Sequence, residues 1–197
     1  MRLTLFFLLA STFSFSATRA QAPASVPVFK IVPNESAIHF SVKATAPVDG
    51  TFGKWNATLT FTSPDVTSGV LDIKIQAASV NTGNGIKNRK LKGKDFFNAK
   101  RDALITFRST RVIQTGPDSF EVSGDFTLRG VTKVQTLALT ITGKGTGSGR
   151  IIGTMAFDRK DYGMTKGIPF VKIADRVEVS VNLKATQVSG PRLVYKQ

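Results

Sequence analysis

Residues 38–43 read Ile-His-Phe-Ser-Val-Lys, an unbroken alternation of apolar and polar side chains. Such alternation is typical of a β-strand that buries one face and exposes the other. The same pattern recurs in segments 71–75, 105–107, 120–126, 137–141, 151–157 and 177–183. The sequence therefore predicts half-buried antiparallel strands, and no long helical pattern accompanies them.

Turn-forming residues separate these segments. Ser, Pro, Asp and Gly gather at residues 63–65, 115–118 and 143–149, and these residue types favour tight turns. About eight strands joined by such turns favour closure of the sheet, because a barrel leaves no strand edge exposed. We therefore expect an all-β protein, a single antiparallel β-barrel of about eight strands.

Residues 81–99 interrupt the strand pattern. The segment has no alternation, contains three glycines and ends near the apolar pair Phe96-Phe97. Because glycines weaken helices, we expect a short helix within a long crossover segment. The segment, with the residue that follows it, is also rich in cations. These are Lys87, Arg89, Lys90, Lys92, Lys94 and Lys100.

The first twenty residues have the layout of a secretory signal peptide. A basic start at Arg2 precedes a short apolar run and small residues that end at Ala20, which is the usual order of such a leader. The apolar run is shorter than the roughly 20 residues that span a membrane; an anchoring N-terminal helix is the alternative. We expect cleavage after Ala20 and export. The sequence then divides into a tail at 21–28, a barrel domain at 29–188 and a tail at 189–197.

The charge balance is strongly basic. The 197 residues include 27 Lys and Arg against 13 Asp and Glu, a formal net charge of +14. Loss of residues 1–20 removes two arginines and no acidic residue, which leaves +12. Such a surplus attracts anionic partners, for example lipid headgroups or a membrane surface. Since an exported protein rarely meets nucleic acid, we expect no nucleic-acid partner.

Candidates for catalysis and metal binding are weak. The chain has no Cys and one His, which excludes disulfide scaffolds, thiol nucleophiles and Cys-ligated or multi-histidine metal centres. His39 lies on the polar phase of its strand, where a surface role is usual. The glycines at 143–149 match no phosphate-loop spacing, which favours a hairpin turn. Asp158 and Asp161 flank two cations, which favours salt bridges at a strand end. We expect no metal, no cofactor and no catalysis.

Aromatic residues are abundant beyond the leader. Eleven of the 15 Phe residues follow residue 20, together with one Trp and two Tyr. Large side chains on the inward phase can fill a barrel of about eight strands or surround one ligand. The residues alone leave both interpretations open.

Five segments carry a recognisable combination of motifs. They are Ala78–Gly83, Leu91–Phe97, Ile105–Ser109, Gly124–Lys133 and Arg159–Gly163. In this order they resemble the YceI-like family of lipid- or polyisoprenoid-binding proteins, over about 29–185. The resemblance implies an extended lipocalin-like barrel, usually periplasmic, whose apolar interior holds a long-chain isoprenoid or related amphiphile. The chain departs from the family in the crossover, where Asn88 and Lys90 replace an acidic residue and a histidine.

The predicted lipid site combines apolar residues of the strands and the crossover. They are Ile38, Phe40, Val42, Phe52, Trp55, Leu59, Phe61, Ile73, Ile75, Leu91, Phe96, Phe97, Ile105, Phe107, Phe126 and Leu128. Phe40, Phe107 and Phe126 are expected to line one continuous tube. Headgroup or membrane contact is predicted for the basic crossover residues Lys87, Arg89, Lys90 and Lys92, whose charged ends can reach water above an apolar mouth.

The leading hypothesis is a periplasmic carrier for an isoprenoid-type or fatty lipid, with no catalysis. One alternative is a basic module with a solid core that binds an anionic membrane surface or an acidic redox partner. Another is a lipid-modifying enzyme on the same barrel. The sequence leaves open whether the chain forms a homodimer.

Overall fold

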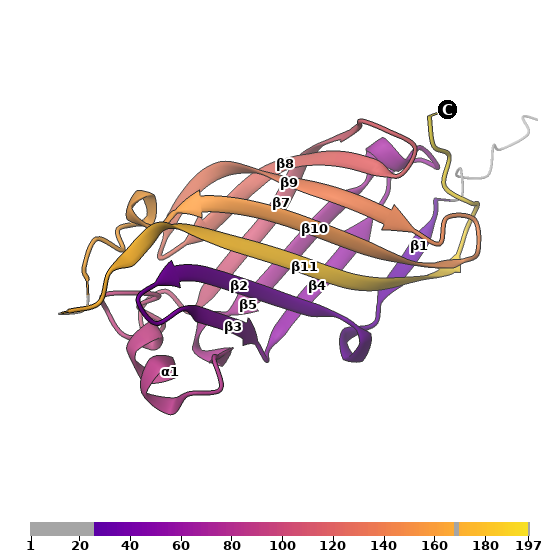
Figure 1. The fold of residues 1–197 in the computed structure, drawn as a ribbon. Helices are drawn as coiled ribbons and strands as arrows, with labels where there is room; N and C mark the ends of the chain where they lie inside the picture. The colour runs from indigo at the N-terminus through magenta and orange to yellow at the C-terminus, as the bar shows by residue number, and fades with distance from the viewer. Residues whose placement is uncertain (1–25, 168–169, 197) are drawn as a thin grey trace, which may run out of the picture.

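The computed structural model describes residues 26–167 and 170–196, and Figure 1 shows an elongated, strongly curled sheet. The leader predicted at residues 1–20 lies outside the described residues, as does its cleavage position. The described residues form eleven strands. They are β1 (Val28–Ile31), β2 (Ala37–Ala44), β3 (Val48–Phe52), β4 (Trp55–Thr60), β5 (Val70–Gln76), β6 (Val80–Asn81), β7 (Leu104–Gln114), β8 (Ser119–Leu128), β9 (Val131–Thr142), β10 (Ser148–Asp158) and β11 (Ile173–Ser189).

All the strands belong to one sheet. Its order is β4-β5-β7-β8-β9-β10-β11-β2-β3-β6, and β1 also pairs with β11. Each pairing of named strands is antiparallel, which confirms the predicted all-β antiparallel barrel. Eight strands have six or more residues, in agreement with the predicted number. The other three, β1, β3 and β6, are too short to show a clear alternation.

The sheet curls until its flanks meet at β1. This strand pairs with residues 185–189 of β11, whereas β2 pairs with residues 173–182 of the same strand. On its other side β1 packs against β4. There the ring centroids of Phe29 and Phe61 lie 5.7 Å apart. Side-chain packing therefore closes this seam.

A bulge in β7 bends the sheet at its middle. One residue is inserted between Ser109 and Arg111 relative to β8. The buried Ser109 hydroxyl accepts a hydrogen bond from the Leu71 backbone N–H at 2.9 Å. A Cβ at Gly124, opposite the bulge, would lie 2.4 Å from the Arg108 carbonyl oxygen. Bulges increase the local bend of a strand, and here the bend brings the two backbones too close for any residue except glycine.

The apolar phase of the alternation faces the interior, as predicted. Phe40, Phe107 and Phe126 expose 6%, 5% and 6% of their surface, whereas His39 is exposed, as the sequence indicated. In the strand register Phe107 lies opposite Ile73 on one side and Phe126 on the other. The inward-facing side chains of neighbouring strands are therefore in register. A slip of one residue in any pairing would turn the side chains of that strand to the opposite face.

The crossover contains the predicted short helix, α1 (Gly85–Lys92). The Asn84 side chain caps it by accepting hydrogen bonds from the backbone N–H groups of Ile86 and Lys87, both at 3.0 Å, a typical N-terminal cap. None of its side chains is buried. Within the described residues, no helix has the length and apolar character that a membrane span requires.

Candidate ligand-binding site

The barrel interior keeps two apolar spaces, one toward each end. The helix-side chamber lies beside α1 and has a volume of about 110 Å³. The tail-side chamber lies under the C-terminal segment and has a volume of about 330 Å³. The two sets of described lining residues do not overlap. The tail-side set includes Phe29, Leu59, Phe61, Leu71, Val112, Phe120, Val122, Leu139, Ile141, Ile151, Leu193 and Tyr195.

Successive inward positions of one strand face different spaces. On β5, Ile75 lines the helix-side chamber and Leu71 lines the tail-side chamber, while Ile73 between them lines neither. Strands β8, β10 and β11 show the same order. We call the buried layer between the chambers the divider: Ile73, Phe107, Leu137, Met155, Val181 and Leu183. Phe107, which was predicted to line one continuous tube with Phe40 and Phe126, lies in this buried layer and lines neither chamber.

Most of the predicted lipid contacts line the helix-side chamber. They are Ile38, Phe40, Val42, Phe52, Ile75, Leu91, Phe96, Phe97, Ile105, Phe126 and Leu128. The rings of Phe40, Phe52 and Phe97 form a cluster with centroids 5.5 to 6.0 Å apart. Phe96 and Phe97, which follow α1, are buried. These two side chains close this end of the barrel.

The structure places five other predicted residues away from this chamber, in addition to Ile73 and Phe107 of the divider. Leu59 and Phe61 line the tail-side chamber. Trp55 is half-buried and borders a separate surface groove beside Lys54 and Lys74. The remaining two are Arg89 and Lys92, which are exposed and border neither chamber.

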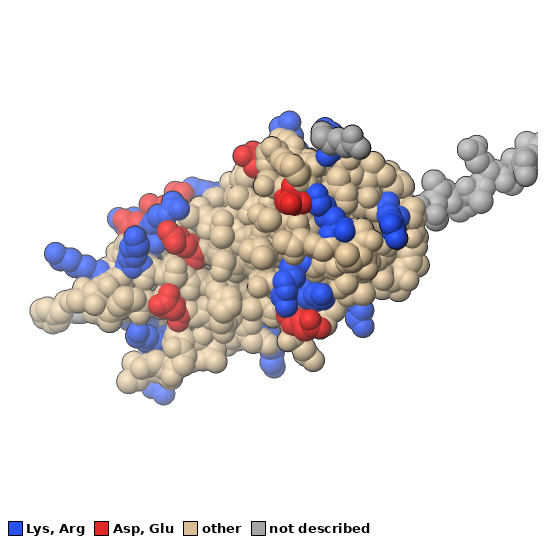
Figure 2. Space-filling view, turned by 45° about the vertical axis from the view of Figure 1, so that its right-hand side comes forward, with Lys and Arg blue, Asp and Glu red and all other residues tan. Residues whose placement is uncertain are grey.

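Two of the cations predicted to meet a headgroup, Lys87 and Lys90, border the helix-side chamber. Lys87 Nζ donates a hydrogen bond to the Pro47 carbonyl at 3.0 Å. Lys90 Nζ lies 3.7 Å from the Asp95 carboxylate. Figure 2 shows the Lys and Arg side chains spread over the visible face and interleaved with acidic ones. Of the four cations predicted to contact a headgroup, these two are the ones that border the chamber.

Arg159 borders the same chamber, although the sequence indicated only a salt-bridge partner at a strand end. It is 7% exposed. Its Nη2 lies 3.0 Å from Asp175 Oδ1, and its Nε and Nη1 donate to backbone carbonyls within 164–174. The guanidinium thereby ties the segment after β10 to the barrel end. The signal for it in the sequence was the Arg159–Gly163 motif, which the resemblance used without assigning a role to the arginine.

Of the two predicted salt-bridge partners near Arg159, Asp161 forms an ion pair, whereas Asp158 caps the short helix that follows it. Asp158 Oδ1 accepts a hydrogen bond from the Lys160 backbone N–H at 2.8 Å. Asp161 Oδ1 lies 2.9 Å from Lys133 Nζ. The Lys160 ammonium lies 2.6 Å from Asp175, and this contact holds the pKa of the Asp175 carboxyl below its usual range.

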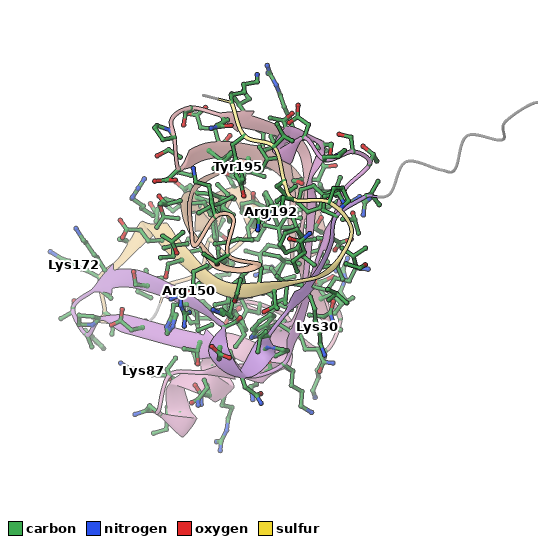
Figure 3. All side chains as sticks on the ribbon, turned by 90° about the vertical axis from the view of Figure 1, so that its right-hand side faces the viewer. Lys30, Lys87, Arg150, Lys172, Arg192 and Tyr195 are labelled. Atoms are coloured by element: carbon green, nitrogen blue, oxygen red, sulfur yellow. The ribbon has the colours of Figure 1, made fainter. Side chains whose placement is uncertain are left out.

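The C-terminal segment, which the sequence indicated as a tail, packs onto the barrel. Leu193 and Tyr195 line the tail-side chamber. Figure 3 shows Arg192 and Tyr195 over this end of the barrel. Burial raises the pKa of the Tyr195 hydroxyl. The glycine-rich residues 143–149 form the β9–β10 hairpin turn at the same rim, as predicted.

An antiparallel barrel that keeps apolar space inside has a lipocalin-like architecture. The sequence model of the YceI-like domain matches residues 29–185, and the chain belongs to the YceI-like family. A UPF0312 protein of Ectopseudomonas mendocina is 30% identical over 124 residues, 60% of this chain and 65% of that protein. Protein YceI of Escherichia coli O157:H7 is 34% identical over 96 residues, 49% of this chain and 50% of that protein. The matches thus span less than two thirds of these relatives.

Solved structures share the fold. BcnA of Burkholderia cenocepacia has a TM-score of 0.72 at 25% identity, with 80% of this chain and 100% of that chain covered. A polyisoprenoid binding domain from Saccharophagus degradans has a TM-score of 0.67 at 17% identity, with 82% and 99% covered. The second likeness shows the fold alone.

Proposed function

We propose that the protein binds and carries a long-chain isoprenoid or related amphiphilic lipid in the barrel interior, in the periplasm after removal of its leader. The observation that carries the proposal is the helix-side chamber, whose strand-borne lining is apolar and whose rim holds Lys87 and Lys90. Burial there removes methylene groups from water at about 0.8 kcal/mol each. The two ammonium groups suit a phosphate or another polar head.

The interior favours this proposal over the two alternatives. A basic module with a solid core does not need the spaces of about 110 and 330 Å³ inside the barrel. The buried polar residues of the described chain, Ser109 and Arg159, are both engaged in structural hydrogen bonds. The Saccharophagus degradans domain of the same fold is described as polyisoprenoid binding. We therefore propose binding rather than catalysis.

Loading of a long chain requires the crossover to open. A volume of about 110 Å³ is below the roughly 300–1,000 Å³ of typical ligand pockets. Helix α1 buries no side chain, and much of its attachment is polar. Asn88 Oδ1 accepts hydrogen bonds from the backbone N–H and the hydroxyl of Thr82, both at 2.8 Å. Elements with few buried contacts open at lower free energy than the core, so α1 forms the moving cover.

Native mass spectrometry of protein from its own host tests the proposal. We expect a co-purifying apolar mass, and uptake of a polyprenyl phosphate by lipid-free protein. Leu91→Trp should reduce uptake, because Leu91 lines the helix-side chamber. Ile86→Trp is the matched control on the same helix, since Ile86 is 80% exposed. A lipid-free mass together with no uptake by the parent protein would contradict the proposal.

A further inference from the structure

The tail-side chamber shares no described lining residue with the helix-side chamber of the proposed lipid site. Its volume of about 330 Å³ lies within the range of ligand pockets. Three divider residues that separate it from the helix-side chamber, Phe107, Met155 and Leu183, are 5%, 8% and 0% exposed. On β8 its lining consists of Phe120 and Val122, and Gly124, the next inward position toward the divider, lies about 13 Å from Phe120 at 3.3 Å per residue. A ligand of moderate length can therefore enter from this end without displacing the divider.

The C-terminal segment 191–196, here called the strap, covers this chamber. The Val194 backbone N–H donates to the Pro64 carbonyl at 2.8 Å, and the Val194 carbonyl accepts from the Val66 N–H at 3.0 Å. Gln114 holds the end of the strap through two hydrogen bonds with the Lys196 backbone, at 2.7 and 2.9 Å. Because few hydrogen bonds hold the strap, it opens at low free energy and gives the chamber its own entrance.

Of the two cationic side chains at this entrance, one has an acidic partner among the described residues and the other does not. Lys144 Nζ lies 2.5 Å from Asp118 Oδ1, and it sits 4.8 Å from the centroid of the Tyr195 ring. Its charge is therefore already paired. Arg192 also lines the chamber, and its guanidinium has no ion pair or hydrogen bond among the described residues. No acidic residue belongs to the described lining.

We infer that the tail-side chamber is a second binding site, for the hydrocarbon tail of a single-chain anionic amphiphile of the fatty-acid class. The tail lies against Phe120, Leu139 and Ile151, and the carboxylate pairs with Arg192. A guanidinium presents a planar fork of donors that matches a carboxylate. Leu193 and Tyr195 of the strap close over the tail. This site is distinct from the proposed lipid carrier function and does not rest on it.

Calorimetric titration with sodium dodecanoate, and with 1-dodecanol as the uncharged probe, tests the inference. We expect the parent protein to bind one dodecanoate, about tenfold more tightly than dodecanol. Arg192→Gln should remove most of that tenfold preference. Lys196→Gln is the matched control: it removes a neighbouring cation of the strap that does not line the chamber. An unchanged preference in Arg192→Gln, or an equal loss in Lys196→Gln, would overturn the headgroup assignment.

A matched pair of substitutions locates the site. Leu193→Trp fills the tail-side chamber from the strap, and Leu91→Trp fills the helix-side chamber from α1; both leucines are half-buried. Leu193→Trp should weaken dodecanoate binding at least tenfold and spare polyprenyl phosphate uptake, and Leu91→Trp should do the reverse. Leu193→Phe replaces the tryptophan variant if that variant does not fold.

Each outcome separates this inference from the proposed function. If Leu193→Trp binds dodecanoate as the parent does, the second site is refuted while the lipid site stands. If each variant weakens both ligands equally, the interior is one continuous site. Failure of polyprenyl phosphate uptake alone would refute the proposed function and leave the second site intact.

Discussion

Replacing Phe107 with alanine should destabilise the barrel and join its two chambers. Phe107 is 5% exposed and lies between Ile73 and Phe126 in the strand register. Removal of a buried phenyl ring loses its transfer free energy and leaves a cavity, at a cost of about 3–5 kcal/mol in the free energy of unfolding. Because the ring belongs to the layer between the chambers of about 110 and 330 Å³, the cavity would form a passage between them.

Urea unfolding followed by the fluorescence of Trp55 measures the first effect. With a denaturant slope of about 2 kcal/mol per molar urea, the loss should lower the midpoint by roughly 2 M. Val134→Ala is the control on β9, since Val134 is 69% exposed and a surface substitution changes stability by less than about 0.5 kcal/mol.

Chain-length preference measures the second effect. In the parent protein the divider limits the depth of the tail-side chamber, so hexadecanoate should bind no more tightly than dodecanoate. In Phe107→Ala the longer chain should gain affinity relative to the shorter one. A destabilisation below about 1 kcal/mol would show that the Phe107 ring is not tightly packed. An unchanged affinity ratio would show that Phe107 does not separate the chambers.

Three other predictions concern the crossover, Asp175 and the leader. Charge reversal of Lys87, Arg89 and Lys90 should slow lipid loading from anionic vesicles and flatten its salt dependence, because such contacts are screened beyond roughly 8–10 Å at physiological salt; an unchanged salt slope in a loading assay would leave only a solvated loop. The ionised Asp175, whose folded-state pKa is lowered, stabilises the fold above its unfolded pKa of about 3.9, and that contribution is lost as pH falls through the lower folded value. Asp175→Asn should therefore show a shallower fall in urea midpoint from pH 5 to 2, and a curve parallel to that of the parent would contradict this. N-terminal sequencing of the exported protein should begin at Gln21 or within a few residues of it, and retention of residue 1 would refute the leader.

The sequence predicted the local structure and its orientation well. Alternation at residues 38–43 identified β2 and the face that it buries, because the two faces of a strand meet different solvents. The glycines and missing alternation of residues 81–99 indicated a short helix in a crossover, and α1 occupies residues 85–92. Strand alternation and helix formation depend on residues that are close in the sequence, so they can be predicted from the sequence alone.

Long-range packing decided the rest. The sequence indicated Arg159 only as a salt-bridge partner at a strand end, yet it is buried because carbonyls from a later segment satisfy its donors. Residues 191–196 show no pattern, and they form a strap because Val194 finds partners at Pro64 and Val66. Such partners are distant along the chain, so the residues around Arg159 and Val194 do not predict these contacts.

The sequence by itself determined which residues face inward, and the tertiary structure decided which space each of them meets. Leu71, Ile73 and Ile75 belong to one alternation and are equivalent in the sequence, but they face the tail-side chamber, the divider and the helix-side chamber in turn. The physical reason is that alternation reports only the side of a strand. The height at which a side chain lies along the barrel axis depends on the register and curvature of all the strands together. Both are set when the sheet closes.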